Sequence, residues 1–188
     1  MTALAVIAIL AIIVLLWAIA TYNGLVRLFN LRDEAWSGVD VQLRRRFDLV
    51  PNLVETVKGY SIHEQNTLQK VTEARSAIAG ASTPGTRIDA ENALTSTLHS
   101  LFAVSEACPE LKANTNFLRL QSELSSLEND LQLARRYYNG AVRNFNSAIQ
   151  VFPAVLVSRR LGYSPSPFFQ TDSESKAPVQ VKFQEEKN

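Results

Sequence analysis

Apolar side chains recur at alternating steps of three and four residues along most of the chain, and this spacing predicts long helices. The most regular row comprises Ala113, Phe117, Leu120, Leu124, Leu127, Leu131, Ala134, Tyr138, Ala141, Phe145, Ala148 and Phe152. Its period is that of a coiled-coil seam. We expect a helix of roughly 60 Å whose first turn contains Pro109 and which ends or kinks at Pro153.

Two further apolar rows predict the partners of this helix. One comprises Trp36, Val39, Leu43, Arg46, Val50, Leu53, Val57, Tyr60, Glu64, Thr67, Val71, Ala74 and Ile78, and the other comprises Ile88, Leu94, Leu98, Leu101 and Phe102. The loop GASTPGT at residues 80–86 separates them. Because no row can bury its apolar face alone, we expect an all-α fold, an antiparallel up-and-down bundle of three or four long helices.

The stretch RRRFDLVPNLVETVKGY, residues 44–60, places a proline inside the second row. Pro51 removes one helical hydrogen bond, yet the three-four spacing passes through it without a change of phase. This continuity predicts one helix through Pro51. A break is better placed at Gly59, because Ser61 and Glu64 have the spacing of a capping box. That break gives four helices, and its absence gives three.

The N-terminal run from Ala3 to Ala20 is apolar throughout, close to the roughly 20 residues that a membrane-spanning helix needs. The alternative is a cleaved signal peptide, since Ala18 and Ala20 resemble a cleavage site, but no Lys or Arg precedes the run. We therefore expect an uncleaved transmembrane anchor at residues 1–22, an antiparallel helical bundle at 23–162 and a mostly extended or flexible tail at 163–188. Arg27 and Arg32 follow the run, which favours an outside N-terminus and a cytoplasmic bundle; the alternative places the bundle outside.

Composition narrows the function classes. The chain of 188 residues has a net charge of +1, without the basic excess expected of a nucleic-acid-binding protein. A single cysteine, Cys108, excludes an intramolecular disulfide and a multi-cysteine metal site. The adjacent His63 and Glu64 diverge by about 100° on a helix, and His99 stands alone. We therefore predict a non-catalytic protein with no cofactor and no metal.

Four residues form the candidate interaction surface: Arg44, Arg45, Arg46 and Asp48. In one interpretation the aliphatic parts of the arginines cover the edge of the bundle while their guanidinium groups reach water or nearby carboxylates. In the other, the arginines dock a lipid phosphate or an acidic partner. The residues alone leave both open.

Four segments carry a resemblance to a known family. They are AWSGVDVQLRRRFDLVPNLVETVKGYSIHE (35–64), PELKANTNFLRLQSEL (109–124), ARRYYNGAVRNFN (134–146) and FPAVLVSRRLGY (152–163), and FF (168–169) and PVQVKF (178–183) extend the match. The sequence resembles the LemA family over nearly its whole length, although Cys108 and Asp130 depart from the common pattern. The resemblance implies a bacterial single-pass membrane protein with a helical bundle and a part in membrane organisation. It implies no active-site residues.

These observations predict a scaffold in the bacterial inner membrane that contacts the lipid bilayer, self-associates as a homo-oligomer or recruits a membrane-protein partner, and organises or remodels the membrane. An alternative is an adaptor or regulator of a membrane protease or signalling protein. A third hypothesis, an enzyme using His63 and Glu64, has the least support.

Overall fold

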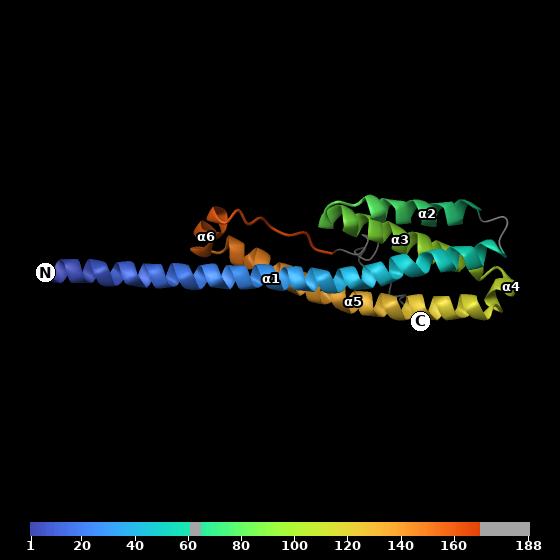
Figure 1. The fold of residues 1–188 in the computed structure, drawn as a ribbon, viewed down its shortest axis with the longest axis horizontal. Helices are drawn as coiled ribbons and strands as arrows, with labels where there is room; N and C mark the ends of the chain where they lie inside the picture. The colour runs from blue at the N-terminus through green and yellow to red at the C-terminus, as the bar shows by residue number, and fades with distance from the viewer. Residues whose placement is uncertain (61–64, 170–188) are drawn as a thin grey trace, which may run out of the picture.

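The computed structural model describes residues 1–60 and 65–169, and this part of the chain is built from helices and their connections. The helices are α1 (Thr2–Lys58), α2 (Gln65–Gly80), α3 (Pro84–Ser105), α4 (Pro109–Lys112), α5 (Thr115–Gln150) and α6 (Ala154–Arg160). Figure 1 shows α1 and α5 as a long antiparallel pair, with the α2–α3 hairpin packed over the C-terminal half of α1. The predicted all-α bundle with an N-terminal apolar helix is confirmed.

Helix α1 runs for 57 residues and passes through Pro51 without a break, as the spacing predicts. The carbonyl of Phe47 cannot receive a helical hydrogen bond from a proline four residues later. Arg75 of α2 supplies a replacement: its Nε donates to the Phe47 oxygen at 3.4 Å, and its guanidinium carbon lies 4.0 Å from the centre of the Phe47 ring. Packing against α2 therefore offsets part of the cost of Pro51.

Helix α1 ends at Lys58 with Gly59 as its C-cap, so the predicted break near Gly59 is confirmed and four long helices result. The predicted capping box of Ser61 and Glu64 lies outside the described residues. The start of α3 is well defined, because Thr83 accepts a hydrogen bond from the Thr86 amide and Pro84 occupies the first turn. This agrees with the predicted loop before the third apolar row.

The predicted rows form the core. Their buried members are Val39, Leu43, Val50, Leu53, Val57, Val71, Ala74, Ile78, Ile88, Leu94, Leu98, Leu101, Phe117, Leu120, Leu124, Leu127, Leu131, Tyr138, Ala141 and Phe145. The apolar row packs on α1 along most of the length of α5. The α2–α3 hairpin covers the core over residues 50–57 of α1. The spacing thus identified most of the buried side chains.

Both ends of the longest predicted helix need correction. Asn114 caps α5 by accepting a hydrogen bond from the Phe117 amide at 3.0 Å, so the helix begins at Thr115, and Pro109 starts the separate short helix α4. Ala113, predicted to lie on the row, is exposed between these helices. At the other end α5 stops at Gln150, and Phe152 is 81% exposed instead of buried. A local cap and a turn override the pattern at these two positions.

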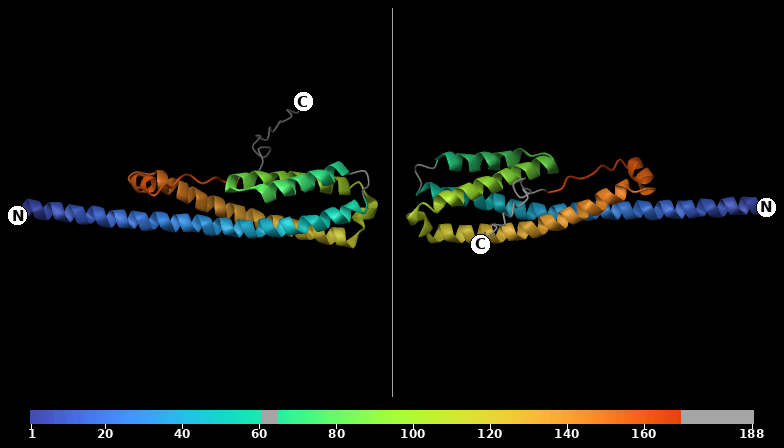
Figure 2. Two further views of the ribbon diagram at one scale, coloured as in Figure 1. Left: turned by 45° about the horizontal axis from the view of Figure 1, so that its top comes forward. Right: turned by 180° about the vertical axis from the view of Figure 1, so that it is seen from behind.

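The chain reverses at α6 and returns along the α1–α5 pair as an extended segment, residues 163–169, on the same side as the hairpin (Figures 1 and 2). Phe169 is buried and belongs to the same core cluster as Ala35, Val39 and Tyr138. Part of the predicted tail is therefore a component of the core. The predicted alternating strand residues Val179, Val181 and Phe183 lie outside the described residues.

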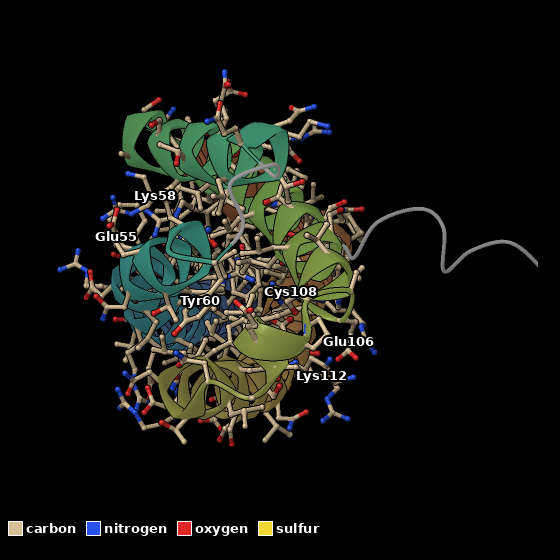
Figure 3. All side chains as sticks on the ribbon, turned by 90° about the vertical axis from the view of Figure 1, so that its right-hand side faces the viewer. Glu55, Lys58, Tyr60, Glu106, Cys108 and Lys112 are labelled. Atoms are coloured by element: carbon tan, nitrogen blue, oxygen red, sulfur yellow. The ribbon has the colours of Figure 1, made fainter. Side chains whose placement is uncertain are left out.

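Figure 3 views the opposite end of the bundle end-on, where α1 ends and the connection containing α4 joins α3 to α5. The Asn114 side chain donates to the Tyr60 hydroxyl at 2.8 Å, which joins the end of α1 to the start of α5. Lys112 pairs with Glu106, and Cys108 lies half-buried between them and the core. Tyr60 is 41% exposed, so the second apolar row leaves the core after Val57 and rejoins it in α2 at Val71.

Candidate functional site

The structure separates the four residues of the predicted interaction surface. Arg44, Arg45 and Asp48 are exposed on α1, whereas Arg46 is 1% exposed and points into the bundle. Successive helical residues diverge by about 100°, so three consecutive arginines cannot share one face. The prediction is wrong for Arg46, which belongs to the core and cannot dock an external partner in this structure.

Arg46 connects three helices through its guanidinium group. Its Nη2 pairs with the Glu91 carboxylate and donates to the Glu91 carbonyl at 3.1 Å. Its Nη1 donates to the Thr95 hydroxyl at 2.8 Å and lies 3.3 Å from the Glu128 carboxylate. Because Arg46 is on α1, Glu91 and Thr95 on α3 and Glu128 on α5, this one side chain positions the hairpin against the long helix pair.

Two further arginines complete this buried charge network. Arg87 Nε lies 2.9 Å from the second Glu91 oxygen, and Arg135 Nη1 lies 3.4 Å from the Glu128 carboxylate. Burial lowers the pKa of Arg135, and nearby Arg46 lowers it further, while Glu128 opposes both effects. The guanidinium of Arg135 also stacks over the Phe169 ring at 4.3 Å, which couples the network to the extended segment.

The apolar rows contain a signal for this network that sequence reasoning missed. Arg46 occupies a position of the second row, and Glu91 stands three residues after Ile88 and three before Leu94, in phase with the third row. A charge at a core position of one helix calls for an opposite charge at a core position of another. Glu128 and Arg135 carry no comparable signal, because the folded structure alone brings them beside Arg46.

The exposed part of the predicted surface lies between two shallow grooves. Arg45 and Asp48 line a groove of about 510 Å³ between α1 and α5, with Glu123 and Asp130 on its other side. Arg44 and Asp48 line a second groove, of about 440 Å³, between α1 and α2. Arg44 and Asp48 form no ion pair with each other in the described part of the chain. Their charged groups are thus available to a partner.

The histidines and the acidic side chains are the residues in which a metal or acid–base site would be sought. No group of three or more His, Cys, Asp or Glu side chains within residues 1–60 and 65–169 could hold a metal ion. His99 is exposed on α3 at the rim of a cleft that also contains Ser125 and Glu128. The predicted dyad of His63 and Glu64 lies outside the described residues.

Two asparagines of α5 bind the backbone of the extended segment. The Asn146 side chain donates to the Ser166 carbonyl at 2.9 Å and accepts from the Ser166 amide at 2.8 Å. Asn139 makes the same pair of bonds with Phe169, at 2.9 and 2.8 Å. Seven helical residues and three extended residues both advance the chain by roughly 10 Å. The two spacings therefore match, so the side-chain amides of Asn139 and Asn146 can both bond to the backbone of the extended segment.

These features lie within the region that comparison with known proteins identifies. The sequence profile of the LemA family matches residues 35–183, which is most of the chain. The chain belongs to the LemA family. It is also similar to Protein LemA of Metamycoplasma hominis, with 27% identity over 158 residues, covering 84% of this chain and 72% of that protein. The matched LemA region contains the charge network, both asparagines and the extended segment, and the apolar start of α1 lies outside it.

Proposed function

We propose that this LemA-family chain is a non-catalytic scaffold anchored in the bacterial inner membrane, where it self-associates or recruits partners and organises or remodels the bilayer. The observation that carries the proposal is the continuity of α1. Its N-terminal apolar window is long enough to cross a membrane and is 0% buried within the protein. The same helix continues without interruption into the bundle core.

A continuous helix transmits orientation, because it has no hinge at which anchor and bundle could move independently. From Thr21 to Lys58, α1 extends roughly 56 Å, so the bundle would project from the bilayer as a stiff rod. Its sides would present the grooves around Arg45 and Asp48 at a set height above the lipid. Such a rod suits the positioning of partners or of further copies of the chain.

The test is the mass and lipid behaviour of the intact protein. In lipid nanodiscs or mild detergent, we expect light scattering to give a mass above that of one chain, or a defined partner to co-purify. Vesicles carrying the protein are expected to cluster or change size. A strict monomer that leaves vesicles and co-purifying proteins unchanged would refute the scaffold.

We propose that the bundle is cytoplasmic and the N-terminus outside. A variant with Cys108→Ser and Glu106→Cys places a single thiol at the exposed distal end. A membrane-impermeant maleimide should label this thiol only after cells are lysed. Labelling in intact cells would support the opposite orientation.

A second candidate function is an adaptor for a membrane protease or signalling protein. The groove between α1 and α5 favours it, because it combines the cationic Arg45 with Asp48, Glu123 and Asp130. A photocrosslinker at the exposed groove residue Asn52 should capture one dominant membrane protein, whereas a matched crosslinker at exposed Gln132 should not. Crosslinks only between copies of the chain would favour self-assembly instead.

A further inference from the structure

The end of α5 reaches the level at which the apolar run of α1 stops. The rings of Phe29 and Phe145 lie 5.8 Å apart, and those of Trp36 and Tyr138 lie 5.2 Å apart. Seven residues along α1 thus correspond to seven residues back along α5. The same register brings Gln150, the last residue of α5, level with Gly24 of α1, about 6 Å along the helix axis from Ala20. Phe152 follows two residues after the end of α5. In Figure 1, the α5–α6 region is the part of the bundle nearest the N-terminal half of α1.

Apolar side chains project outward at this level. Phe152 is 81% exposed, and Val151 and Leu156 are each more than half exposed. We call residues 151–156 the proximal turn. Exposed apolar side chains elsewhere on the bundle are single positions, such as Val41 and Leu118, or the pair Leu133 and Tyr137 on α5, as found on any protein surface. The proximal turn instead gathers three of them beside the expected edge of the hydrocarbon.

The proximal turn is held in place by polar and aromatic contacts. The buried Ser158 hydroxyl donates to the Ile149 carbonyl at 2.7 Å, which joins α6 to the last turn of α5. Gly162 has a φ of 71° and completes a helix-ending motif in which the Tyr163 amide donates to the Ser158 carbonyl. Tyr163 stacks on Phe29 at 5.0 Å. The exposure of Phe152 is therefore built into the packing of α6.

The charges around the proximal turn are of one sign. Arg159 and Arg160 are exposed in the last turn of α6, and Arg27 is exposed on α1. The sequence has no Asp or Glu in residues 1–32 or in residues 131–169. Exposed apolar side chains that have arginines and no carboxylates near them in the sequence suit a bilayer interface, where acyl chains lie beneath phosphate groups.

We propose that the proximal turn inserts into the interfacial layer of the bilayer that α1 crosses, as a second lipid contact. This inference rests on the proposed anchoring of residues 3–20. We assign lipid as the ligand, because the turn follows the end of α5, which lies close to the level at which the exposed apolar run of α1 stops. Two contact points on one rigid body would set both the tilt and the rotation of the bundle about α1.

Depth-dependent quenching in vesicles tests this proposal on the full-length protein. In a Cys108→Ser background, Phe152→Cys and Leu156→Cys each receive the environment-sensitive label NBD. The vesicles contain phosphatidylethanolamine, phosphatidylglycerol and lipids carrying a nitroxide either near the headgroup or deep in the chain. Leu133→Cys, similarly exposed but far along α5, is the matched control, and Leu10→Cys reports the anchor.

We expect the labels at Phe152 and Leu156 to lose most of their emission with the shallow nitroxide and much less with the deep one, while the Leu133 label is unaffected. If the Leu10 label is quenched but the Phe152 label behaves like the Leu133 control, the second contact is overturned and the anchor stands. If the Leu10 label is also unquenched, the anchoring proposal itself fails. Blue-shifted Phe152-label emission that no nitroxide quenches would reveal a protein occupant and overturn the proposal.

The arginines provide an independent arm of the test. Changing Arg159→Gln together with Arg160→Gln should reduce quenching of the Phe152 label in vesicles containing phosphatidylglycerol. The matched change Arg136→Gln, at an exposed arginine of α5 away from the turn, should leave it unaltered. Equal quenching in both variants would overturn the part of the proposal that assigns these cations to phosphate headgroups.

Discussion

Replacing Arg46 with methionine is expected to destabilise the bundle strongly. Arg46 and Glu91 have side chains that are 2% and 0% exposed, so solvent screens their interaction very little. Removal of one partner from a buried ion pair costs about 3–5 kcal/mol, because the other charge stays buried without compensation. Arg87 still contacts Glu91 in the variant, which places the expected loss near the lower end, at about 3 kcal/mol.

The assay is urea unfolding of the intact protein in a mild detergent, followed by far-UV circular dichroism. Arg44→Met is the matched control, since Arg44 is exposed, makes none of these contacts and should change the free energy of unfolding by at most about 0.5 kcal/mol. The slope of the transition with urea should stay the same in both variants, so that the midpoint reports stability.

A double variant separates a lost ion pair from a lost side-chain volume. Changing Glu91→Leu together with Arg46→Met removes both charges and should recover most of the stability, because apolar replacements of a buried pair are often neutral or better. Glu128 is partly exposed and keeps Arg135 as a partner. The reasoning would be refuted if Arg46→Met were no more disruptive than Arg44→Met, or if the double variant were less stable than Arg46→Met alone.

Three further changes test local contacts by the same unfolding assay. Asn139→Leu removes both bonds to the Phe169 backbone and should cost about 1–3 kcal/mol, whereas an unchanged midpoint would show that the segment is not held there. Burial raises the pKa of Tyr138, whose hydroxyl donates to the Pro167 carbonyl. The folded state therefore holds the Tyr138 proton more strongly than the unfolded state does. The free energy that this proton contributes to folding is present below about pH 10 and is lost as the pH rises through the folded pKa of Tyr138. Tyr138→Phe should be less stable than wild type at neutral pH, and the difference in the free energy of unfolding should shrink as the pH rises through the folded pKa of Tyr138. A difference that stays constant with pH would contradict this. Asn114→Ala should cost about 1 kcal/mol by removing the N-cap of α5, and Asn114→Asp, which keeps an acceptor, is its control.

The long helices could be predicted from the sequence, because a helix that buries one face has apolar residues at steps of three and four. The three-four rows predicted most of the core and the passage through Pro51, while the capping-box spacing of Ser61 and Glu64 predicted the break at Gly59. Predictions failed where a single local interaction changed the backbone, as at Asn114, whose cap moves the start of α5, and at Phe152, which lies beyond its end. Caps and turns depend on one or two hydrogen bonds, which a row of apolar residues does not reveal.

The candidate site divides in the same way. Arg44, Arg45 and Asp48 were found as a charged cluster and are exposed, but whether a partner binds them stays a prediction. Arg46 looked like their neighbour and is instead the centre of a buried network with Glu91 and Glu128, which lie on other helices. The rows of the sequence place each residue on a face of its own helix, and they do not say which residues of two helices meet.

The amino-acid sequence by itself determined the helices, their apolar faces, the N-terminal run and the family, because these depend on local spacing and composition. Only the tertiary structure decided the register of α1 against α5, and with it the burial of Arg46, the pairing of Asn139 and Asn146 with the extended segment, and the position of α6 toward the N-terminal half of α1 (Figure 1). Register is set by the simultaneous packing of distant segments, so no single stretch of the chain contains it.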